Sequence, residues 1–487
     1  MTPIPGPIIL LALPLLAAVA TYVVRRWALL ASLVAALTTA ILAFLCFRLP
    51  LTQSAFVLGQ EVAFGRPVVI AGRELILAST GQIWLGFVFV LAAALFLFAW
   101  RSPQGRGFHS MSLIILGLYS LMTLLQSFAL SAIVLGISAA MAVFLLQSEA
   151  RPSVRGAERY LQVVVLSIPL LLAAAWLNEQ GSPSSMQALL PAAIGFGLLM
   201  AIFPFGTWMP AVSAEAPPLA TALVFSAGQA MALYLLLAFV DSAPWVLVGT
   251  NTAHIVLVSG LIMAFAGGLM AAVQRDWGRL LGYAALSDLG LVLLGLVSGG
   301  SQDRILALLH LVNRSVAITL MAMSLSVLRQ YAGGDRFDRL RGVVQRLPIA
   351  SLGLLVGGLS LAGFPFTPGF ASHWAIARST LNQVEPLATV GGNEGILGFL
   401  SMVEEPWLWI AALVALLASS AGIVLGLLRG LSAMLGDGSE ELTIQQPTIA
   451  SWMILALIVL ALAAGLVPQL FLEPVSAAAG VSTLFSP

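Results

Sequence analysis

The chain consists largely of apolar runs that are long enough to cross a lipid bilayer. A helix needs about 20 consecutive apolar residues to span the hydrocarbon core, and such runs recur along all 487 residues. Only 8% of the residues are charged, against about 25% in soluble domains, so a water-soluble or disordered chain is excluded. We therefore predict an all-α polytopic membrane protein with about fourteen transmembrane helices. The predicted spans lie near 8–24, 28–47, 82–100, 110–127, 129–147, 160–177, 187–204, 219–240, 252–273, 279–298, 305–328, 348–388 (interrupted), 406–428 and 449–472.

The loops between these runs predict the orientation of the chain. With the N-terminus outside, the cytoplasmic loops hold fifteen arginines and the outer loops hold four, as the positive-inside rule requires. We expect a multi-pass protein of a bacterial-type cytoplasmic (inner) membrane, with both termini outside. No basic segment or small-residue cleavage site precedes the first apolar run, so we expect a retained span and not a cleaved signal peptide.

One long polar insertion, residues 48–78, interrupts the apolar pattern. The short apolar stretches Val57–Leu58, Val68–Ile70 and Leu75–Leu77 predict a small hairpin outside the membrane. The predicted organisation is a three-helix segment at 1–109, two groups of five spans, and a C-terminal loop and last helix at 431–487. The two five-span groups cover 110–240 and 252–430.

Several kinds of chemistry are absent from the sequence. The chain has no lysine, so all 21 basic residues are arginine, and the net charge of +1 gives no basic surface for nucleic acid. The single cysteine, Cys46, lies in an apolar run and is expected to be a buried hydrophobic side chain. The four histidines lack metal-ligand spacing. We expect no metal, no cofactor and no redox site in this chain.

Two spans are interrupted by proline and glycine. The first interruption is Phe203–Pro210, followed by Glu215–Pro218, and the second is Gly363–Phe370. Broken backbone at membrane depth is tolerated where it faces protein or a water-filled cavity. Ordinary proline kinks would also explain one such break, but two at corresponding places favour an inverted repeat, so we predict two inverted five-helix repeats, each with one broken helix. The residues that define the breaks are Pro204, Pro210, Pro217, Pro218, Pro365, Pro368 and Gly369.

The residues around these breaks resemble a known family. Ile202–Ala211 reads IFPFGTWMPA and Glu215–Pro218 reads EAPP, which is similar to the F-P-F-H-x-W-L-P-D-A and E-A-P-T signatures of the antiporter-like membrane subunits of respiratory complex I. Arg279–Gly290 and Leu361–Phe370 resemble two further segments of that family. The same family supplies subunits of multisubunit cation/proton antiporters and of related membrane hydrogenases. The resemblance covers roughly residues 110–430.

The resemblance implies a proton route along lysines, a glutamate and histidines at mid-membrane, and this chain departs from it. Positions that carry the family's glutamate or lysines correspond to Gly136, Leu199 and Ile318, so these path positions are lost. A further lysine position falls near Gln229 or Ala230. The family's histidine in the tenth span corresponds to Asp288, and its eleventh- and twelfth-span groups correspond to Arg314 and His373. The implied ion path is therefore lysine-free and degenerate.

The remaining ionisable residues within spans belong to the second half. His310 and Arg314 are four residues apart and share one face of a helix, and Asp288 is expected to pair with Arg314. Histidine titrates near neutrality, so His373 and His310 are the expected proton carriers; the alternative is a static polar core. His254 and Arg378 are expected to snorkel at span ends. The candidate path residues are His373, Asp288, His310, Arg314, Asn313 and Gln229.

Three functions are compatible with these features. The first is a non-catalytic membrane-arm subunit of a complex I-like, quinone-linked NADH or ferredoxin dehydrogenase. The second is the membrane subunit of a cation/proton antiporter, or of a proton- or cation-driven inorganic-carbon uptake complex. The third is a non-conducting scaffold. All three predict a multisubunit complex with other membrane and soluble subunits, in contact with the lipid bilayer and with protons or other cations. The charged run Asp335–Arg341 is expected to be a solvated face or a docking surface for a neighbouring subunit.

Overall fold

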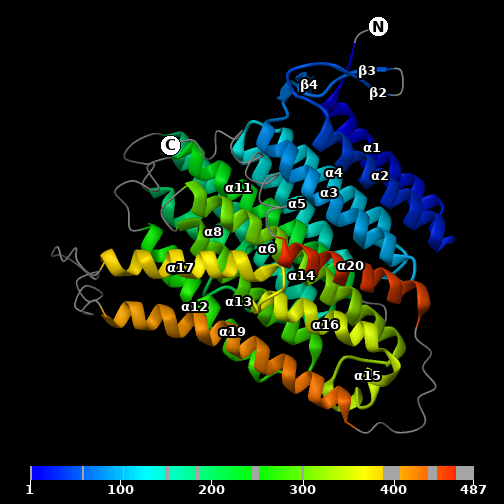
Figure 1. Ribbon diagram of the computed structural model, residues 1–487. Helices are drawn as coiled ribbons and strands as arrows, with labels where there is room; N and C mark the ends of the chain where they lie inside the picture. The colour runs from blue at the N-terminus through cyan, green and yellow to red at the C-terminus, as the bar shows by residue number, and fades with distance from the viewer. Residues whose placement is uncertain are drawn as a thin grey trace. The chain divides into compact units, whose positions relative to one another are not determined.

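The structure is a computed structural model that describes residues 3–57, 60–102, 104–147, 154–180, 187–243, 252–297, 301–387, 406–436 and 447–467. The described chain is almost entirely helical (Figure 1). It forms two compact units, which lie within Met1–Thr250 and Asn251–Ala477.

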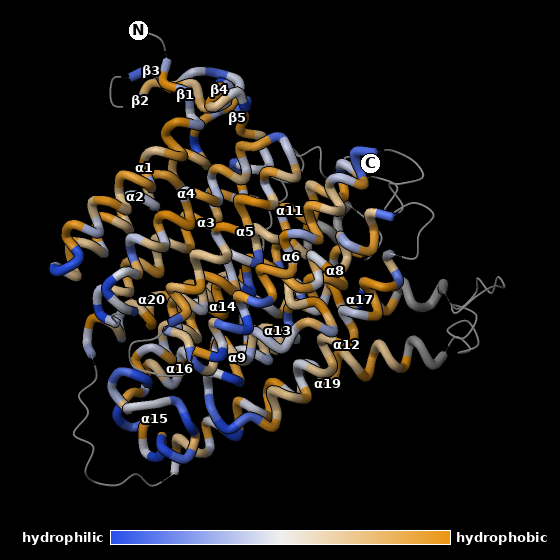
Figure 2. The backbone as a smooth tube through the Cα atoms, turned by 180° about the vertical axis from the view of Figure 1, so that it is seen from behind, coloured by the Kyte–Doolittle hydropathy of each residue, from blue (hydrophilic) through white to orange (hydrophobic). Residues whose placement is uncertain are grey.

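The helices are those of a polytopic membrane protein. Among the described residues, 11 helices are long and apolar enough to cross a membrane, and three shorter apolar helices cover Phe108–Leu124, Leu189–Leu199 and Pro348–Leu361. Figure 2 shows that hydrophobic residues follow the helices, whereas hydrophilic residues gather in the short strands and around α15. The structure confirms the all-α polytopic class. The number fourteen and the inverted repeats stay predictions.

The first unit contains the helices up to residue 242. Consecutive helices pack against each other in the pairs α2·α3, α4·α5 and α5·α6, and α1 packs against α4. The eighth predicted span is one continuous rod made of α10, a π-helical turn and α11. The elements are α1 (Gly6–Val23), α2 (Ala28–Arg48), α3 (Ser79–Ala99), α4 (Phe108–Leu124), α5 (Phe128–Leu146), α6 (Arg155–Glu179), α8 (Leu189–Leu199), α9 (Trp208–Glu215), α10 (Pro218–Leu223), the π-helical turn η1 (Val224–Gly228) and α11 (Gln229–Ser242).

The polar insertion at 48–78 forms short strands. The strands β4 (Val68–Ile70) and β5 (Arg73–Leu75) pair as an antiparallel hairpin. Its two turn residues, Ala71 and Gly72, both have positive φ, which matches the right-handed twist of a two-residue hairpin. In a second sheet, β3 (Gln60–Ala63) lies between β1 (Ile4–Pro5) and β2 (Ala55–Val57). The expected strand at 68–70 is therefore present, but its partner begins at residue 73 and not at 75. Leu58 lies outside the described residues.

The second unit contains the helices from residue 252 onward. α13 packs against α12 and α14, and α14 also packs against both halves of the interrupted span, α16 and α17. α17 and α19 lie side by side (Figure 1). The elements are α12 (Thr252–Ala272), α13 (Trp277–Val297), α14 (Ser301–Tyr331), η3 (Phe337–Arg339), α15 (Val343–Arg346), α16 (Pro348–Leu361), α17 (Gly369–Leu387), α19 (Pro406–Leu435) and α20 (Thr448–Leu466).

Both predicted helix breaks occur, and the helix before each break ends with the same backbone geometry. After α8, Ala201 has φ 59° and the Ile202 N–H donates to the Gly197 carbonyl at 2.8 Å. After α16, Gly363 has φ 67° and the Phe364 N–H donates to the Leu359 carbonyl at 2.9 Å. A left-handed residue followed by this long-range N–H bond is the Schellman helix ending. α8 and α16 thus both end in a Schellman turn, and a proline-containing segment follows each of them.

The charged run Asp335–Arg341 combines four exposed charged side chains with one buried aspartate. Asp335 is 3% exposed because the Arg329 guanidinium at the end of α14 binds its carboxylate, with Nη2–Oδ2 at 2.7 Å. Phe337 is also buried and its ring meets Trp277 edge-on. The other four charged residues, Arg336, Asp338, Arg339 and Arg341, are exposed, and the hydrogen bonds from Arg336 lower the pKa of Asp338. The run is therefore an exposed charged surface, as the sequence predicts, except at Asp335, which an arginine outside the run holds in a buried position.

Candidate functional site

Four buried polar side chains from three helices of the second unit meet in one cluster. Asp288 comes from α13, His310 and Arg314 come from α14, and His373 comes from α17. The first three side chains are at most 1% exposed and that of His373 is 9% exposed. We call these four residues the polar cluster. It brings together the charged candidates that sequence reasoning selected from three separate spans.

Asp288 is the centre of the polar cluster. Its Oδ1 lies 3.2 Å from His310 Nε2 and 4.0 Å from His373 Nδ1. Its other oxygen, Oδ2, lies 3.4 Å from Arg314 Nε, so the pairing with Arg314 that the sequence predicts is present in the geometry. The Arg314 Nη2 group also donates to the Ala285 carbonyl at 3.0 Å, one turn before the aspartate. One carboxylate therefore faces a permanent cation on one oxygen and two histidines on the other.

Local sequence explains how these groups reach one another. His310 and Arg314 project from the same face of α14 because they are one helical turn apart. His373 lies in the first turns of α17 and reaches the cluster beside Gly363, where a Cβ would stand 2.5 Å from the imidazole Cγ. Gly363 also has a positive φ, which glycine adopts without steric cost. The second helix break thus needs glycine both for its backbone and for the position of His373.

The second break is fastened to α14 by polar contacts next to the cluster. The Asn313 amide donates to the Pro368 carbonyl at 2.8 Å and to Ser372 Oγ at 3.2 Å. Ser372 Oγ is also 2.9 Å from His310 Nδ1 and lies within hydrogen-bond distance of the Gly369 carbonyl at 3.2 Å. Since Asn313 and His310 are on α14 while Pro368 and Ser372 belong to the break and α17, these bonds tie the break to the cluster.

The hydrogen bonds of His310 constrain where its protons lie. A proton on Nε2 would lie close to the Asp288 carboxylate, whose Oδ1 is 3.2 Å away, although these two atoms do not have hydrogen-bond geometry, and both arrangements at Nδ1 take Nε2 as protonated. At Nδ1 there are two arrangements, because a serine hydroxyl can donate or accept. If the Ser372 hydroxyl donates to Nδ1, His310 is neutral; if it donates to the Gly369 carbonyl, Nδ1 donates to Ser372 and His310 is cationic. The rotation of one hydroxyl group therefore distinguishes the two charge states.

The donor set also matches that of a metal site. The ligand atoms of Asp288, His310 and His373 all lie within 4.8 Å of one another, and two imidazoles with one carboxylate suit a divalent transition metal. However, the Arg314 guanidinium already neutralises the carboxylate. A divalent cation would leave two uncompensated positive charges in a buried site, at a large desolvation cost. A single added proton would leave only one uncompensated positive charge. The charge balance of the site therefore favours the binding of a proton over the binding of a divalent metal ion.

In the first unit, two of the positions that the family resemblance assigns to lysine line one small cavity. Leu199 at the end of α8 and Gln229 at the start of α11 face it, together with the aromatic rings of Tyr119, Tyr160 and Trp208. The cavity encloses about 10 Å³, roughly the minimum that one water molecule needs. The amide nitrogen of Gln229 donates to Met209 Sδ at 3.3 Å. Apart from the two tyrosine phenols, no titratable side chain lines the cavity.

The remaining predicted residues are distributed along both units. Gly136 on α5 faces the Ile168 side chain, and Ile318 is fully buried one turn after Arg314. His254 and Arg378 are exposed on α12 and α17, as expected for groups that snorkel. Gln229 belongs to the first unit and has no part in the polar cluster. Sequence reasoning did not select Ser372, although its position directly before His373 and after the break is a signal that could have identified it.

Comparisons with known proteins agree with the residues that carry the resemblance. A family model described as NADH:quinone oxidoreductase/Mrp antiporter, TM, matches residues 78–392. Formate hydrogenlyase subunit 3 of Escherichia coli (strain K12) is 31% identical over 218 residues, which cover 42% of this chain and 35% of that protein. NADH-quinone oxidoreductase subunit N of Chromohalobacter salexigens is 35% identical over 188 residues, which cover 38% of this chain and 39% of that protein. The chain thus spans well under half of the length of these curated relatives.

Solved structures share the fold over nearly the whole chain. A chain of the Mrp complex from a Dietzia species has a TM-score of 0.79 at 16% identity, with 99% of this chain and 98% of that chain covered. A chain of respiratory complex I from Thermus thermophilus has a TM-score of 0.71 at 18% identity, with 97% and 100% covered. At these identities the likeness concerns the fold alone.

Proposed function

The chain belongs to the NADH:quinone oxidoreductase/Mrp antiporter transmembrane family, and on that premise we propose that it is an antiporter-like membrane-arm subunit of a complex I-like, quinone-linked dehydrogenase. Electron transfer would take place in other subunits of the complex. The role of this chain would be to move protons through its second unit. The first unit, with its lysine-free path positions, would support the arm structurally.

The observation that carries this proposal is the polar cluster beside the second helix break. Ionisable groups inside membrane segments are costly and are usually retained for function. Here two histidines share one carboxylate oxygen, at 3.2 Å and 4.0 Å, so a proton can move between neighbouring groups after small side-chain shifts. Arg314 keeps its own proton at physiological pH, and its role would be to hold Asp288 in place and to compensate its charge.

The bonds of His310 support a relay through its imidazole ring. Neutral His310 accepts the Ser372 hydroxyl at Nδ1 and holds its proton on Nε2. When Nδ1 takes up a second proton, the Ser372 hydroxyl turns to the Gly369 carbonyl, 3.2 Å away. The Nε2 proton can then pass to Asp288 and on to His373. One proton enters at Nδ1 and one leaves at Nε2, so the ring again holds one proton, but on Nδ1, and the first tautomer must be restored before the next transfer.

The test is proton flux in vesicles that contain the intact complex and a pH-sensitive dye. His373→Ala and His310→Gln should each lower the flux at least about tenfold, since proton transfer by a positioned side chain typically contributes 10²-fold or more. His254→Ala is the matched control, because His254 is an exposed histidine of the same unit, and it should leave the flux unchanged. Equal flux in all three variants would contradict proton transfer through the cluster and favour a static polar core.

The second candidate is the membrane subunit of a multisubunit cation/proton antiporter or of a cation-driven uptake complex. It is favoured by the family itself, whose description joins oxidoreductase and antiporter subunits. The subunits that copurify with the chain separate the candidates. Quinone-reductase subunits would support the first, and a complex without any redox subunit would replace it with the second.

A further inference from the structure

An apolar groove lies on the outer surface of the first unit, between α2 and α3. It is a shallow groove, lined by small side chains together with aromatic and branched ones. It has a volume of about 540 Å³. The residues that line it include Ala40, Ala43, Phe44, Phe47, Arg48 and Val90.

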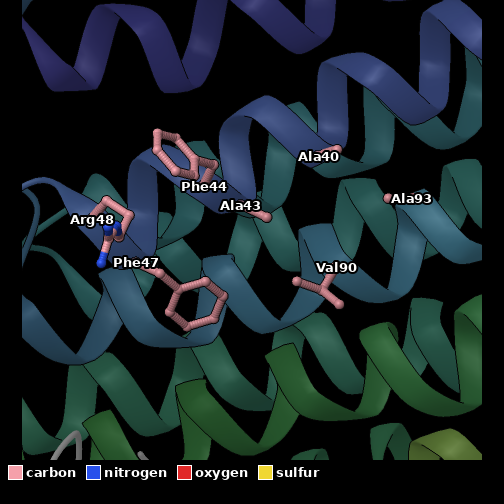
Figure 3. A pocket seen from close by; sticks show the side chains of 7 residues that line it. All are labelled: Ala40, Ala43, Phe44, Phe47, Arg48, Val90 and Ala93. Carbon is pink, nitrogen blue, oxygen red and sulfur yellow. The ribbon is translucent and has the colours of Figure 1, made fainter. Parts of the chain in front are cut away.

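The groove is apolar along its length and charged at one end. Arg48 and Phe47 lie at that end, and Ala93 lies at the other (Figure 3). Phe44 is 61% exposed and Val90 is 52% exposed, so more than half of each side chain is left uncovered by the other described residues. Phe47 leans on Gly86 of α3, where a Cβ would stand 2.8 Å from its ring. A lipid acyl chain suits this surface, because its lining is apolar apart from Arg48.

The position of Arg48 indicates how deep the groove lies in a membrane. Arg48 is the last residue of α2, a 21-residue apolar helix, so it belongs at the level of the lipid headgroups. The eight residue steps from Ala40 to Arg48 rise about 12 Å along the helix. The groove thus runs from the headgroup level into the hydrocarbon core of one leaflet. No ion pair joins Arg48 to a carboxylate among the residues described.

We propose that this groove is a binding site for one anionic phospholipid, with its phosphate on the Arg48 guanidinium and one acyl chain between Phe44, Phe47 and Val90. Arginine binds phosphate through two parallel N–H bonds. A headgroup ammonium would compete for the phosphate, so a headgroup without a cation is preferred. The site is independent of the polar cluster and of the proposed proton transfer.

The test uses phosphatidylglycerol with a photoactivatable acyl chain in vesicles of phosphatidylglycerol and phosphatidylcholine that contain the full-length chain in its complex. After illumination, mass spectrometry of peptides should place the label on residues 40–48 and 90–93. Arg48→Gln should reduce labelling about fivefold, which corresponds to ~1 kcal/mol per basic residue at an anionic lipid surface. Ala40→Phe should reduce it by filling the groove.

Two matched variants serve as controls. Arg26→Gln removes an exposed arginine at the other end of α2, and Leu33→Phe enlarges an exposed side chain of the same helix outside the groove. Both should leave labelling unchanged. Labelling that is uniform along α2, or that is equal in Arg48→Gln and Arg26→Gln, would overturn the site and indicate ordinary lipid contact. A cross-link from the groove to another polypeptide of the complex would overturn it in favour of a subunit interface.

Discussion

The two units each contain a helix that ends in a Schellman turn before a proline-containing segment, but they differ in what surrounds the break. In the first unit the neighbouring positions hold Leu199 and Gln229 in a cavity of about 10 Å³. In the second unit the break is tied by hydrogen bonds to the polar cluster around Asp288. A broken helix is therefore a backbone feature that can persist without charged side chains or histidines beside it. The proposed proton path rests on the buried titratable side chains next to the second break and not on the break itself.

The largest expected effect in this comparison follows from Arg314→Leu. Removing the guanidinium leaves Asp288 charged in a buried site, which typically costs about 3–5 kcal/mol. We expect little or no assembled complex, measured as purification yield and as the midpoint of thermal unfolding. Arg378→Leu, at an exposed position of α17, should assemble normally.

A double variant separates the loss of charge balance from the loss of packing. If Asp288→Leu is combined with Arg314→Leu, both charges are removed, and much of the stability should return because apolar replacement of a buried pair is often neutral. Normal assembly of the Arg314→Leu variant would show that Arg314 is not needed to compensate the charge of buried Asp288.

Substitutions at the left-handed residues of the two Schellman turns are expected to change the stability of the protein in opposite directions. Gly363→Ala places a Cβ against the His373 ring and in a left-handed conformation, which together should destabilise the protein by about 2–4 kcal/mol. Ala201→Gly relieves the same conformation at φ 59° and should stabilise it by at most about 1 kcal/mol. Thermal unfolding of the purified complex measures both. A loss of stability in Ala201→Gly would mean that the first break is not strained.

Ser372→Ala removes the hydroxyl next to His310 Nδ1 and is expected to affect the proton flux but not the stability of the complex. The proton flux should fall about tenfold, since one hydrogen bond contributes ~1 kcal/mol or slightly more, while assembly stays normal. Ser372→Thr keeps the hydroxyl and should restore most of the flux. Ser287→Ala removes another buried serine of the same unit, bonded to Ser419 at 2.8 Å, and should not affect flux. If Ser372→Ala and Ser287→Ala behave alike, the relay through His310 is not supported.

The sequence predicts the helices and the breaks well because both follow from local chemistry. Long apolar runs must form helices in a bilayer, and Pro204 or Pro365 cannot continue one. It predicts the residues of the polar cluster for a related reason, since charged groups in apolar runs are conspicuous. It does not predict Ser372, because a serine in a helix looks like any other small residue until its neighbours on α14 are known. The burial of Asp335 is missed because its partner, Arg329, lies outside the charged run.

The smallest expected effect tests the first unit directly. Among the described residues, the Gln229 amide donates to a thioether sulfur, which is a weak acceptor, and leucine has a similar size. Gln229→Leu should therefore change the proton flux by less than about twofold, because one weak bond contributes less than an ordinary hydrogen bond, and it should leave assembly intact. A tenfold loss of flux would place a proton path in the first unit, through the cavity between Tyr119 and Tyr160. The asymmetry between the units would then lie in the kind of group that carries the proton, a phenol in one and imidazole and carboxylate in the other.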